Sequence, residues 1–170
     1  QPQSPGLSER IWWGAGTDST AVWTAQQGLN LMSSTLMLED KGMPFDQQQA
    51  EQIRLYREEW VKAGHTRVPR VSVSRSVIPI IDAESARYFG RRAQEDSQDY
   101  TGIIDNTFSR FGRSYIGEPD LIAEELARDA AVQAADTVLL TVPNQLGVDF
   151  NLRMLESIVK DIKPALRVKA

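Results

Sequence analysis

Short apolar runs alternate with amphipathic stretches four times along this chain, and this alternation constrains the fold more than any other feature. A strand followed by a helix, repeated, is typical of α/β proteins whose helices connect parallel strands. We therefore expect an α/β fold with a parallel sheet, its strands lying at residues 11–13, 29–35, 70–81 and 136–142. The last of these runs is almost entirely apolar, which predicts burial on both of its faces.

The helices expected after these strands have recognisable ends. Gly28 and Gly64 suit the left-handed residue that follows a helix, so helices are predicted at 17–27 and 47–64. Pro119 suits the first turn of a third helix, which we expect to run to residue 133. Asp149 is expected to cap the last helix. The buried stripe of that helix is predicted to consist of Leu152, Leu155, Val159 and Ile162.

A long section between the third strand and the third helix has no regular hydrophobic pattern. Residues 82–116 are dense in Arg, Asp, Gly and Ser. Loops of this length are uncommon inside compact domains, and those that occur are usually functional or mobile. We therefore predict an irregular, mobile and protease-sensitive excursion over residues 82–116.

Composition and charge narrow the class of protein. The 170 residues are 41% hydrophobic and 25% charged, as in soluble globular proteins, and the net charge of -4 argues against a nucleic-acid partner. The chain lacks cysteine and has the single histidine His65, so we expect neither a disulfide nor a metal site. No apolar stretch is long enough for a membrane span and the N-terminus is polar, so a cytoplasmic protein is expected. Residues 1–9 resemble a linker, and residues 167–170 are expected to form a tail.

The first strand, a tight turn and the first helix together form a candidate anion site. Small residues at Gly14, Ala15 and Gly16 let a ligand approach the backbone. The hydroxyls of Thr17, Ser19 and Thr20 follow where the first helical N–H groups have no partner within the helix. Such an arrangement commonly binds phosphate. The alternative is that Thr17 or Asp18 only caps the helix, and short glycine motifs by themselves are weak signals.

The sequence after this loop resembles the bacterial luciferase-like monooxygenases. The resemblance lies in the sequences of three segments, at residues 20–29 (Thr-Ala-Val-Trp-Thr-Ala-Gln-Gln-Gly-Leu), 31–34 and 135–143. Thr24 stands where many relatives have Ala. The resemblance spans residues 7–166 and corresponds to strands five to eight of the eight-stranded barrel. A complete (β/α)₈ barrel needs about 250 residues. The expected fold is therefore the C-terminal half of such a barrel. The excursion at residues 82–116 corresponds to the long segment that these enzymes have after their seventh strand.

The resemblance also implies a cofactor and a reaction. The loop would hold the terminal phosphate of reduced FMN or, alternatively, of the deazaflavin F420, through the backbone of residues 14–16 and the side chains of Thr17 and Thr20. Asp18 would repel a phosphate and is expected to point outward. Together with reduced FMN and dioxygen, such an enzyme oxidises a small organic substrate. The resemblance identifies no catalytic residue in this half.

Two other functions stay open. One is an F420-dependent oxidoreductase of the same superfamily, and the other is a non-catalytic flavin-binding half-barrel. A sugar-phosphate barrel ranks last, because no lysine at a strand end supports Schiff-base chemistry. The open edges of a half-barrel must be covered by the N-terminal half or by a second copy. We therefore expect a homo-oligomer or a complex rather than a stable monomer, and an isolated chain without activity.

Several other residues have both a functional and a structural interpretation. Arg75, inside an apolar strand, either binds an anion or forms a structural ion pair. Trp12 and Trp13 are interpreted as core residues, and His65 as a surface residue or a cation at a helix end. The hydroxyls of residues 33–35 are more often turn residues than ligands. The arginines near the excursion either guide an anion or keep the loop solvated; they are Arg87, Arg91, Arg92, Arg110 and Arg113.

Overall fold

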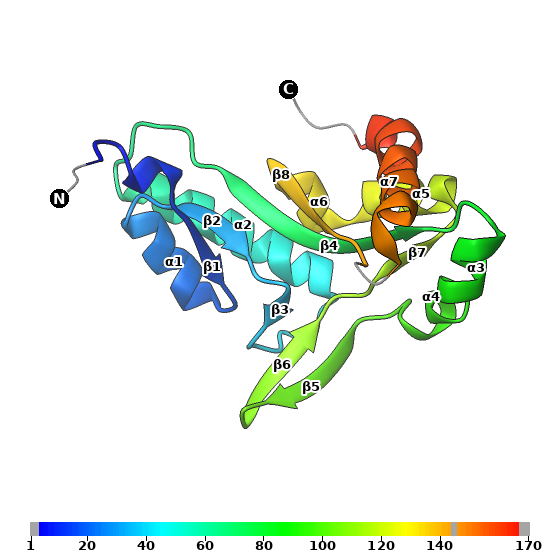
Figure 1. The fold of residues 1–170 in the computed structure, drawn as a ribbon. Coiled ribbons are helices and arrows are strands. Elements are labelled where there is room, and N and C mark those ends of the chain that lie inside the picture. The colour runs from blue at the N-terminus through cyan, green and yellow to red at the C-terminus, as the bar shows by residue number, and fades with distance from the viewer. Residues whose placement is uncertain (1–3, 144–145, 167–170) are drawn as a thin grey trace.

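The computed structural model describes residues 4–143 and 146–166, and the expected tail at 167–170 lies outside them. Five parallel strands form the main sheet, and four of them lie side by side in the order in which they follow one another along the chain (Figure 1). They are β1 (Trp12–Ala15), β2 (Asn30–Ser33), β4 (Val71–Pro79) and β8 (Thr137–Thr141). This mixed α/β structure with its parallel sheet is consistent with half of an α/β barrel.

The first two helices have the ends that the sequence predicts. Helix α1 (Asp18–Gln26) is followed by Gly28 at φ +69°, and α2 (Phe45–Lys62) is followed by Gly64 at φ +77°. A residue with a Cβ atom is strained at these angles, which is why glycine ends both helices. The two helices pack against each other on one side of the sheet (Figure 1).

Strand β4 organises the sheet because it has neighbours on both edges. Its first residues pair with β2 and with β8, and its last residues pair with the short parallel strand β7 (Tyr115–Gly117). Val71, Val73 and Val77 belong to the hydrophobic core beneath the helices. Since side chains alternate along a strand, Ser72, Ser74 and Ser76 lie on the opposite face. One face of β4 therefore carries these valines together with Arg75, and the other carries the hydroxyls.

The section at residues 82–116 is not irregular, which corrects the sequence-based expectation. It contains α3 (Ala83–Phe89), α4 (Arg92–Glu95) and a hairpin of β5 (Tyr100–Ile104) and β6 (Thr107–Phe111). Strand β6 also pairs with β3 (Leu36–Met37), a short strand that follows β2. The hairpin turns at Asp105 and Asn106, both at positive φ, a conformation that these two residue types tolerate.

The helix expected at residues 119–133 is two helices. Helix α5 (Pro119–Arg128) ends at Asp129, whose extended backbone precedes α6 (Ala130–Ala134). The Asp129 carboxylate accepts a hydrogen bond from Val132 N at 2.8 Å and so caps α6. Arg75 also binds this carboxylate, and that distant contact fixes the break.

Both predictions about the C-terminal elements need correction. Strand β8 is exposed instead of buried on both faces: of its five residues only Val138 is partly covered. Among the described residues it pairs with β4 alone. Helix α7 (Gly147–Ser157) starts before Asp149, which lies in its first turn instead of capping it. It continues into a π-helical turn, η2 (Ile158–Ile162), and then η3 (Lys163–Ala165). The buried apolar residues of this region are Phe150, Met154, Ile158 and Ile162.

The stripe predicted to be buried therefore lies largely at the surface. Leu152, Leu155 and Val159 are exposed, and only Ile162 of that stripe is buried. The helix carries two apolar stripes, and the aromatic and aliphatic cluster of Ile78, Phe89 and Ile116 packs against the one that contains Phe150 and Met154. This packing, which depends on residues far away in sequence, decides which stripe is covered.

The segment before the sheet is more ordered than a linker. Residues Ser8–Arg10 form the 3₁₀ turn η1, and Asn30 Nδ2 donates a hydrogen bond to the backbone oxygen of Glu9 at 2.8 Å. Residues 1–3 lie outside the described part of the chain. Within that part, no helix is both long and apolar enough to cross a membrane.

Candidate functional site

The candidate anion site is the loop between β1 and α1, at the carboxyl end of its strand. Thr17 has an extended backbone, and its hydroxyl accepts a hydrogen bond from Thr20 N at 3.2 Å. The Thr17 oxygen also lies 3.0 Å from the Ser19 hydroxyl and 2.9 Å from the Thr20 hydroxyl. The structure thus brings the three predicted hydroxyls together at the first turn of α1, where they can donate hydrogen bonds to an anion.

The small residues of the loop have different surroundings. Gly14 is exposed, and a Cβ at this position would meet no atom within 4 Å. Ala15 is fully buried in the core. A Cβ at Gly16 would lie 3.4 Å from the backbone oxygen of Leu36, so this glycine allows the loop to approach the segment containing β3. Of the three, Gly14 borders open space where a ligand could approach.

A buried glutamine holds the loop in place. Gln52 of α2 donates from Nε2 to the backbone oxygens of Ala15 and Thr17, at 3.3 and 3.1 Å. Its Oε1 accepts a hydrogen bond of 2.7 Å from the Ser33 hydroxyl at the end of β2. The side chain therefore links β1, α1 and β2 behind the hydroxyl cluster. Gln52 is a functional residue that no motif in the sequence singled out.

Two neighbouring glutamines of α2 bind the next loop in the same way. Gln48 donates to the backbone oxygen of Glu39 and Gln49 to that of Ser34, each at 2.7 Å. Polar side chains grouped on the buried face of a long amphipathic helix are the sequence signal that points to such anchors, because buried amides need partners.

Charged side chains surround the helix N-terminus. The Asp18 backbone N–H donates to Glu39 Oε2 at 3.3 Å, and the Asp18 carboxylate forms an ion pair with Lys41. The expectation that Asp18 simply points outward is wrong, since Lys41 holds it. The carboxylate of Glu39 thus lies at the positive end of α1, where an anion is favoured.

Arg75 has a structural partner. Its Nε and Nη2 donate to the two carboxylate oxygens of Asp129 at 2.7 and 2.9 Å, and the Tyr115 hydroxyl donates to the same carboxylate at 2.5 Å. Arg75 and Asp129 are both buried. Burial opposes ionisation of Asp129, but the hydrogen bonds and charge of Arg75 outweigh it and lower the pKa of Asp129. Of the two interpretations of Arg75, the ion pair is the one observed.

The hydroxyls after β2 serve the fold, as expected. Ser33 binds Gln52, and the Ser34 hydroxyl accepts a hydrogen bond from Leu36 N at 3.3 Å. His65 Nε2 lies 2.8 Å from the backbone oxygen of Ala25, so it donates to the last turn of α1. The histidine is thus a hydrogen-bond donor at a helix end, although that helix is α1 and not the helix α2 that His65 follows in the sequence.

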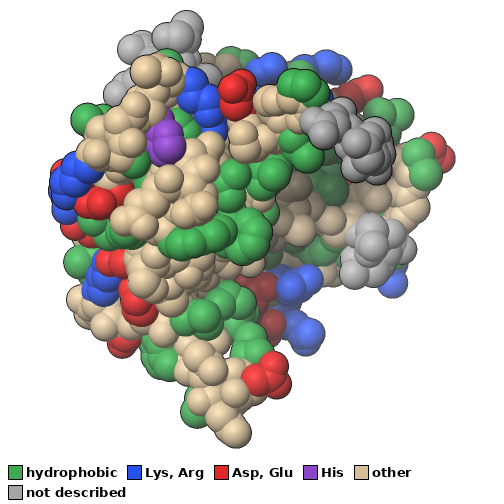
Figure 2. Space-filling view, turned by 90° about the vertical axis from the view of Figure 1, so that its left-hand side faces the viewer, with side chains coloured by type: hydrophobic (Ala, Val, Ile, Leu, Met, Phe, Trp, Pro, Cys, Tyr) green, Lys and Arg blue, Asp and Glu red, His purple; other side chains and the backbone are tan. Residues whose placement is uncertain are grey.

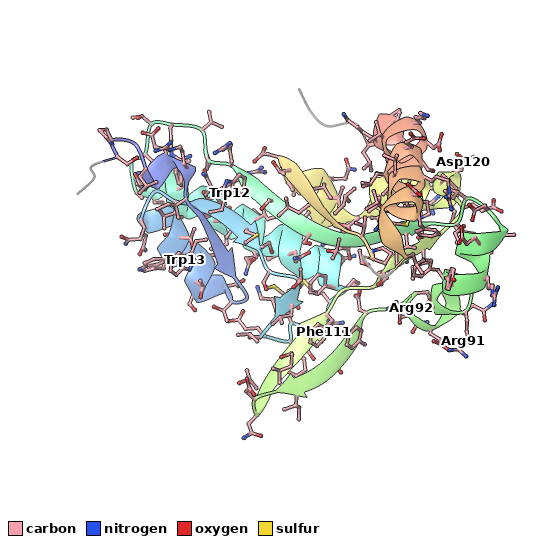
Figure 3. The ribbon with its side chains drawn as sticks, viewed as in Figure 1. Trp12, Trp13, Arg91, Arg92, Phe111 and Asp120 are labelled. Atoms are coloured by element: carbon pink, nitrogen blue, oxygen red, sulfur yellow. The ribbon has the colours of Figure 1, made fainter. Side chains whose placement is uncertain are left out.

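The two tryptophans of β1 are not core residues, which corrects their interpretation. Trp13 packs against Trp23 of α1, with ring centroids 5.0 Å apart, yet it is 44% exposed. Trp12 lies partly exposed beside the guanidinium of Arg70, 5.1 Å from the ring centroid. Figure 3 labels both rings on β1. They are exposed because β1 is the outermost described strand of the sheet.

The arginines near the excursion are mostly paired within the protein. Arg91 and Arg92 pair with Glu95 and Asp96 one turn later, and Arg110 pairs with Asp40 at 2.8 Å. In Figure 3, Arg91 and Arg92 lie at the end of the molecule away from Trp13 and β1. Their contacts favour a structural and solvating role. The structure shows no group of three or more metal-ligating side chains among the described residues.

The chain is similar in fold to one solved monooxygenase in particular. The structure titled monooxygenase RslO1 from Streptomyces bottropensis matches 91% of this chain, with a TM-score of 0.58 and 15% sequence identity. This chain spans 47% of the length of that protein. No protein-family model and no curated protein matches the chain. At this identity the likeness concerns the fold, and the fold is that of about half of a monooxygenase chain.

Proposed function

We propose that this chain is the C-terminal half of a flavin-dependent monooxygenase of the luciferase-like superfamily. The proposal depends above all on the hydroxyl cluster of Thr17, Ser19 and Thr20, which lies at a helix N-terminus directly after a parallel strand. Two findings agree with it: the sheet order of a half-barrel and the likeness in fold to a monooxygenase. Ligands of parallel α/β barrels bind at the carboxyl ends of the strands, where this cluster lies.

The cofactor proposed for this site is reduced FMN, bound by its phosphate. The Thr17, Ser19 and Thr20 hydroxyls would donate hydrogen bonds to it, and the open space at Gly14 would let it approach the backbone. Glu39 is the group that does not suit a phosphate, because its carboxylate accepts from Asp18 N. The Asp18 carboxylate beside the loop is paired with Lys41, so the residues would fit a phosphate once the Glu39 side chain turns away.

The protein's part in such a reaction is binding and orientation. A bound flavin supplies the redox chemistry with dioxygen, by which a small organic substrate is oxidised. Gln52 keeps the loop rigid through Ala15 and Thr17, so the hydroxyls stay in one arrangement. The flavin ring pocket and the catalytic side chains are proposed to belong mainly to the other half of the barrel. The isolated chain would therefore bind without turning over.

The decisive experiment compares FMN with riboflavin, which lacks the phosphate. We expect the 170-residue chain to bind FMN more tightly than riboflavin, measured by flavin fluorescence. Replacing Thr17→Ala together with Thr20→Ala should weaken FMN binding by about 1.5–3 kcal/mol for each hydrogen bond lost to the charged group. Riboflavin binding should not change. Thr107→Ala, an exposed hydroxyl on the hairpin, is the matched control and should leave both unchanged.

Equal FMN affinity in the folded double variant would exclude the loop as the phosphate site. Because Thr17 also caps α1, circular dichroism must first show that the variant is folded. F420 tested in the same way decides between the two cofactors. Preferential, phosphate-dependent binding of F420 would assign the deazaflavin and replace the monooxygenase by an F420-dependent oxidoreductase.

Replacing Glu39 provides an independent check of the same site. Its carboxylate occupies the anion-favouring end of α1, so Glu39→Gln should strengthen FMN binding by removing like-charge repulsion. Asp40→Asn is the matched control, because Asp40 is exposed and pairs with Arg110 instead. Stronger FMN binding in Glu39→Gln only, with no change for riboflavin, is the expected result.

A further inference from the structure

A cavity of about 380 Å³ lies beneath β8, on the side of the sheet that α5 and α6 cover. Val138 of β8 lines it and lies in register with Val73, a core residue on that side. Leu140 faces the same way, because side chains alternate along a strand. Leu126 of α5 and Ile162 of η2 form other walls and are buried. Elements of this chain thus shape the cavity, and its walls are mainly aliphatic.

The last helix changes its form where it lines this cavity. Helix α7 gives way to the π-helical turn η2 at Ile158, and Ile158, Val159 and Ile162 all line the cavity. A π-helical turn is rare, and turns of this kind occur frequently at functional sites. The change of helix form is an observation independent of the cavity volume, and both point to a binding site at η2.

The rim of the cavity carries a net positive charge. Arg57 of α2 and Lys163 of η3 both line it, and Lys163 is exposed. Asp136 also lines it, but its carboxylate accepts a hydrogen bond from Val71 N at 2.8 Å and pairs with Arg57 at 3.6 Å. Two cations and one carboxylate therefore border an aliphatic interior. An anion with an aliphatic chain matches both the rim and the walls.

The cavity is separate from the candidate phosphate loop. Strands β2 and β4 lie between β8 and β1 in the sheet, and the residues that line the cavity do not include the hydroxyl cluster. Figure 2 views the molecule from the end where β1 lies, and there hydrophobic side chains gather on the surface. A ligand beneath β8 would thus be bound apart from the flavin, so this inference goes beyond the proposed function and does not depend on it.

We propose that the cavity binds an aliphatic carboxylate, such as a medium-chain fatty acid. Its hydrocarbon chain would lie between β8 and η2, and its carboxylate would lie at the rim beside Lys163 and Arg57. The cavity volume falls in the range of small-molecule sites. Burial of the chain removes apolar surface from water and gives the cavity walls contacts that an empty space cannot supply. The carboxylate stays at the surface, where it remains hydrated.

Calorimetric titration of the purified chain with hexanoate, octanoate and decanoate tests the aliphatic walls. The affinity should rise about fourfold for each added methylene, as expected when the whole chain is buried. Decyltrimethylammonium, which has the same hydrocarbon chain and the opposite charge, should bind more weakly than decanoate. An affinity independent of chain length, or a cation that binds as tightly as decanoate, would overturn the proposal.

Two variants locate the site. Val138→Phe fills the cavity and should abolish decanoate binding, whereas Val148→Phe, at a position of α7 that is 82% exposed, is the matched control and should not. Lys163→Gln should weaken decanoate binding only a few-fold, because an ion pair at an exposed rim contributes little. Lys160→Gln is its matched control, since Lys160 pairs with Glu156 and does not line the cavity.

Circular dichroism verifies that each variant is folded, and Lys163→Gln keeps the test valid if the larger phenylalanine is not tolerated. Unchanged decanoate affinity in the folded variants would overturn the site beneath β8. Absence of binding at millimolar decanoate would also overturn the proposal and leave the cavity to a polypeptide that completes the sheet. The FMN affinity measured in the presence of decanoate should stay the same, so failure of this proposal and failure of the phosphate site are distinguishable.

Discussion

At the scale of single residues, Asp129 has the largest structural role that the described contacts reveal. Its carboxylate accepts hydrogen bonds from Arg75, Tyr115 and the backbone of Val132. These contacts connect β4, β7 and α6. A buried ion pair of this kind adds little net stability compared with an apolar pair, but losing one partner leaves a buried charge uncompensated.

Asp129→Asn should therefore destabilise the protein strongly. We expect a loss of about 3–5 kcal/mol in the free energy of unfolding, because Arg75 then lacks its counter-charge. Asparagine can still cap α6, so the loss reports mainly on the ion pair. Urea unfolding at pH 7 measures it. Arg75→Met combined with Asp129→Asn should recover part of the loss, and a single-variant loss below about 1 kcal/mol would contradict the assigned role.

The same residue predicts a pH dependence. The pKa of Asp129 is lowered in the folded chain from its ordinary value of 3.8, so the charged form favours folding. Its contribution is fully present above the ordinary pKa and is lost as the pH falls through the folded value. Urea unfolding between pH 5 and about pH 2.5 should show a steeper loss of stability in the parent chain than in Asp129→Asn. Equal slopes would show that other groups control acid unfolding.

At the scale of elements, α2 and the excursion differ in how they are held. Helix α2 is anchored by buried glutamines and by Asp99, whose carboxylate accepts from Phe45 N at 2.8 Å. The same carboxylate accepts from Arg113 N at 3.1 Å and so attaches the base of the hairpin to α2. The far end of the hairpin has no such anchor among the described contacts, and Ile103 there is 77% exposed.

The tip of the β5–β6 hairpin should consequently be the first internal site of proteolysis. Local opening is easiest where few apolar groups are buried, as at Asp105 and Asn106. Brief digestion with a protease of broad specificity, followed by mass spectrometry, should give two fragments that meet near this turn. Within the described residues, a first cut inside α2 would contradict the prediction that residues 82–116 are the most sensitive internal region.

At the scale of the whole molecule, the homo-oligomer expected from the sequence predicts that thermal stability depends on protein concentration. A dimer unfolds with a Tm that rises with concentration, because mass action favours the associated state. We expect this rise in calorimetry of the parent chain over a hundredfold range of concentration. The variant with Leu152→Lys and Leu155→Lys should have a Tm independent of concentration. A constant Tm in the parent would agree with a monomer and contradict the expected homo-oligomer.

Local sequence signals determined those features whose energetics are local. The strand–helix alternation predicted the parallel α/β sheet, Gly28 and Gly64 ended their helices as expected, and Thr17 was one of the two residues considered as the cap of α1. Each depends on backbone angles or hydrogen bonds within a few residues. The close approach of the three site hydroxyls follows in the same way from their spacing on the first turn of α1.

Only the tertiary structure decided the features that depend on distant partners. Asp129 breaks the predicted helix while bound to Arg75, which lies 54 residues earlier in the chain. Helix α7 has two apolar stripes, and contact with Phe89 and Ile78 selects the buried one. Gln52 supports the candidate site from another helix. A single sequence contains these residues but not their pairings, because the energy of a buried contact depends on which groups the fold brings together.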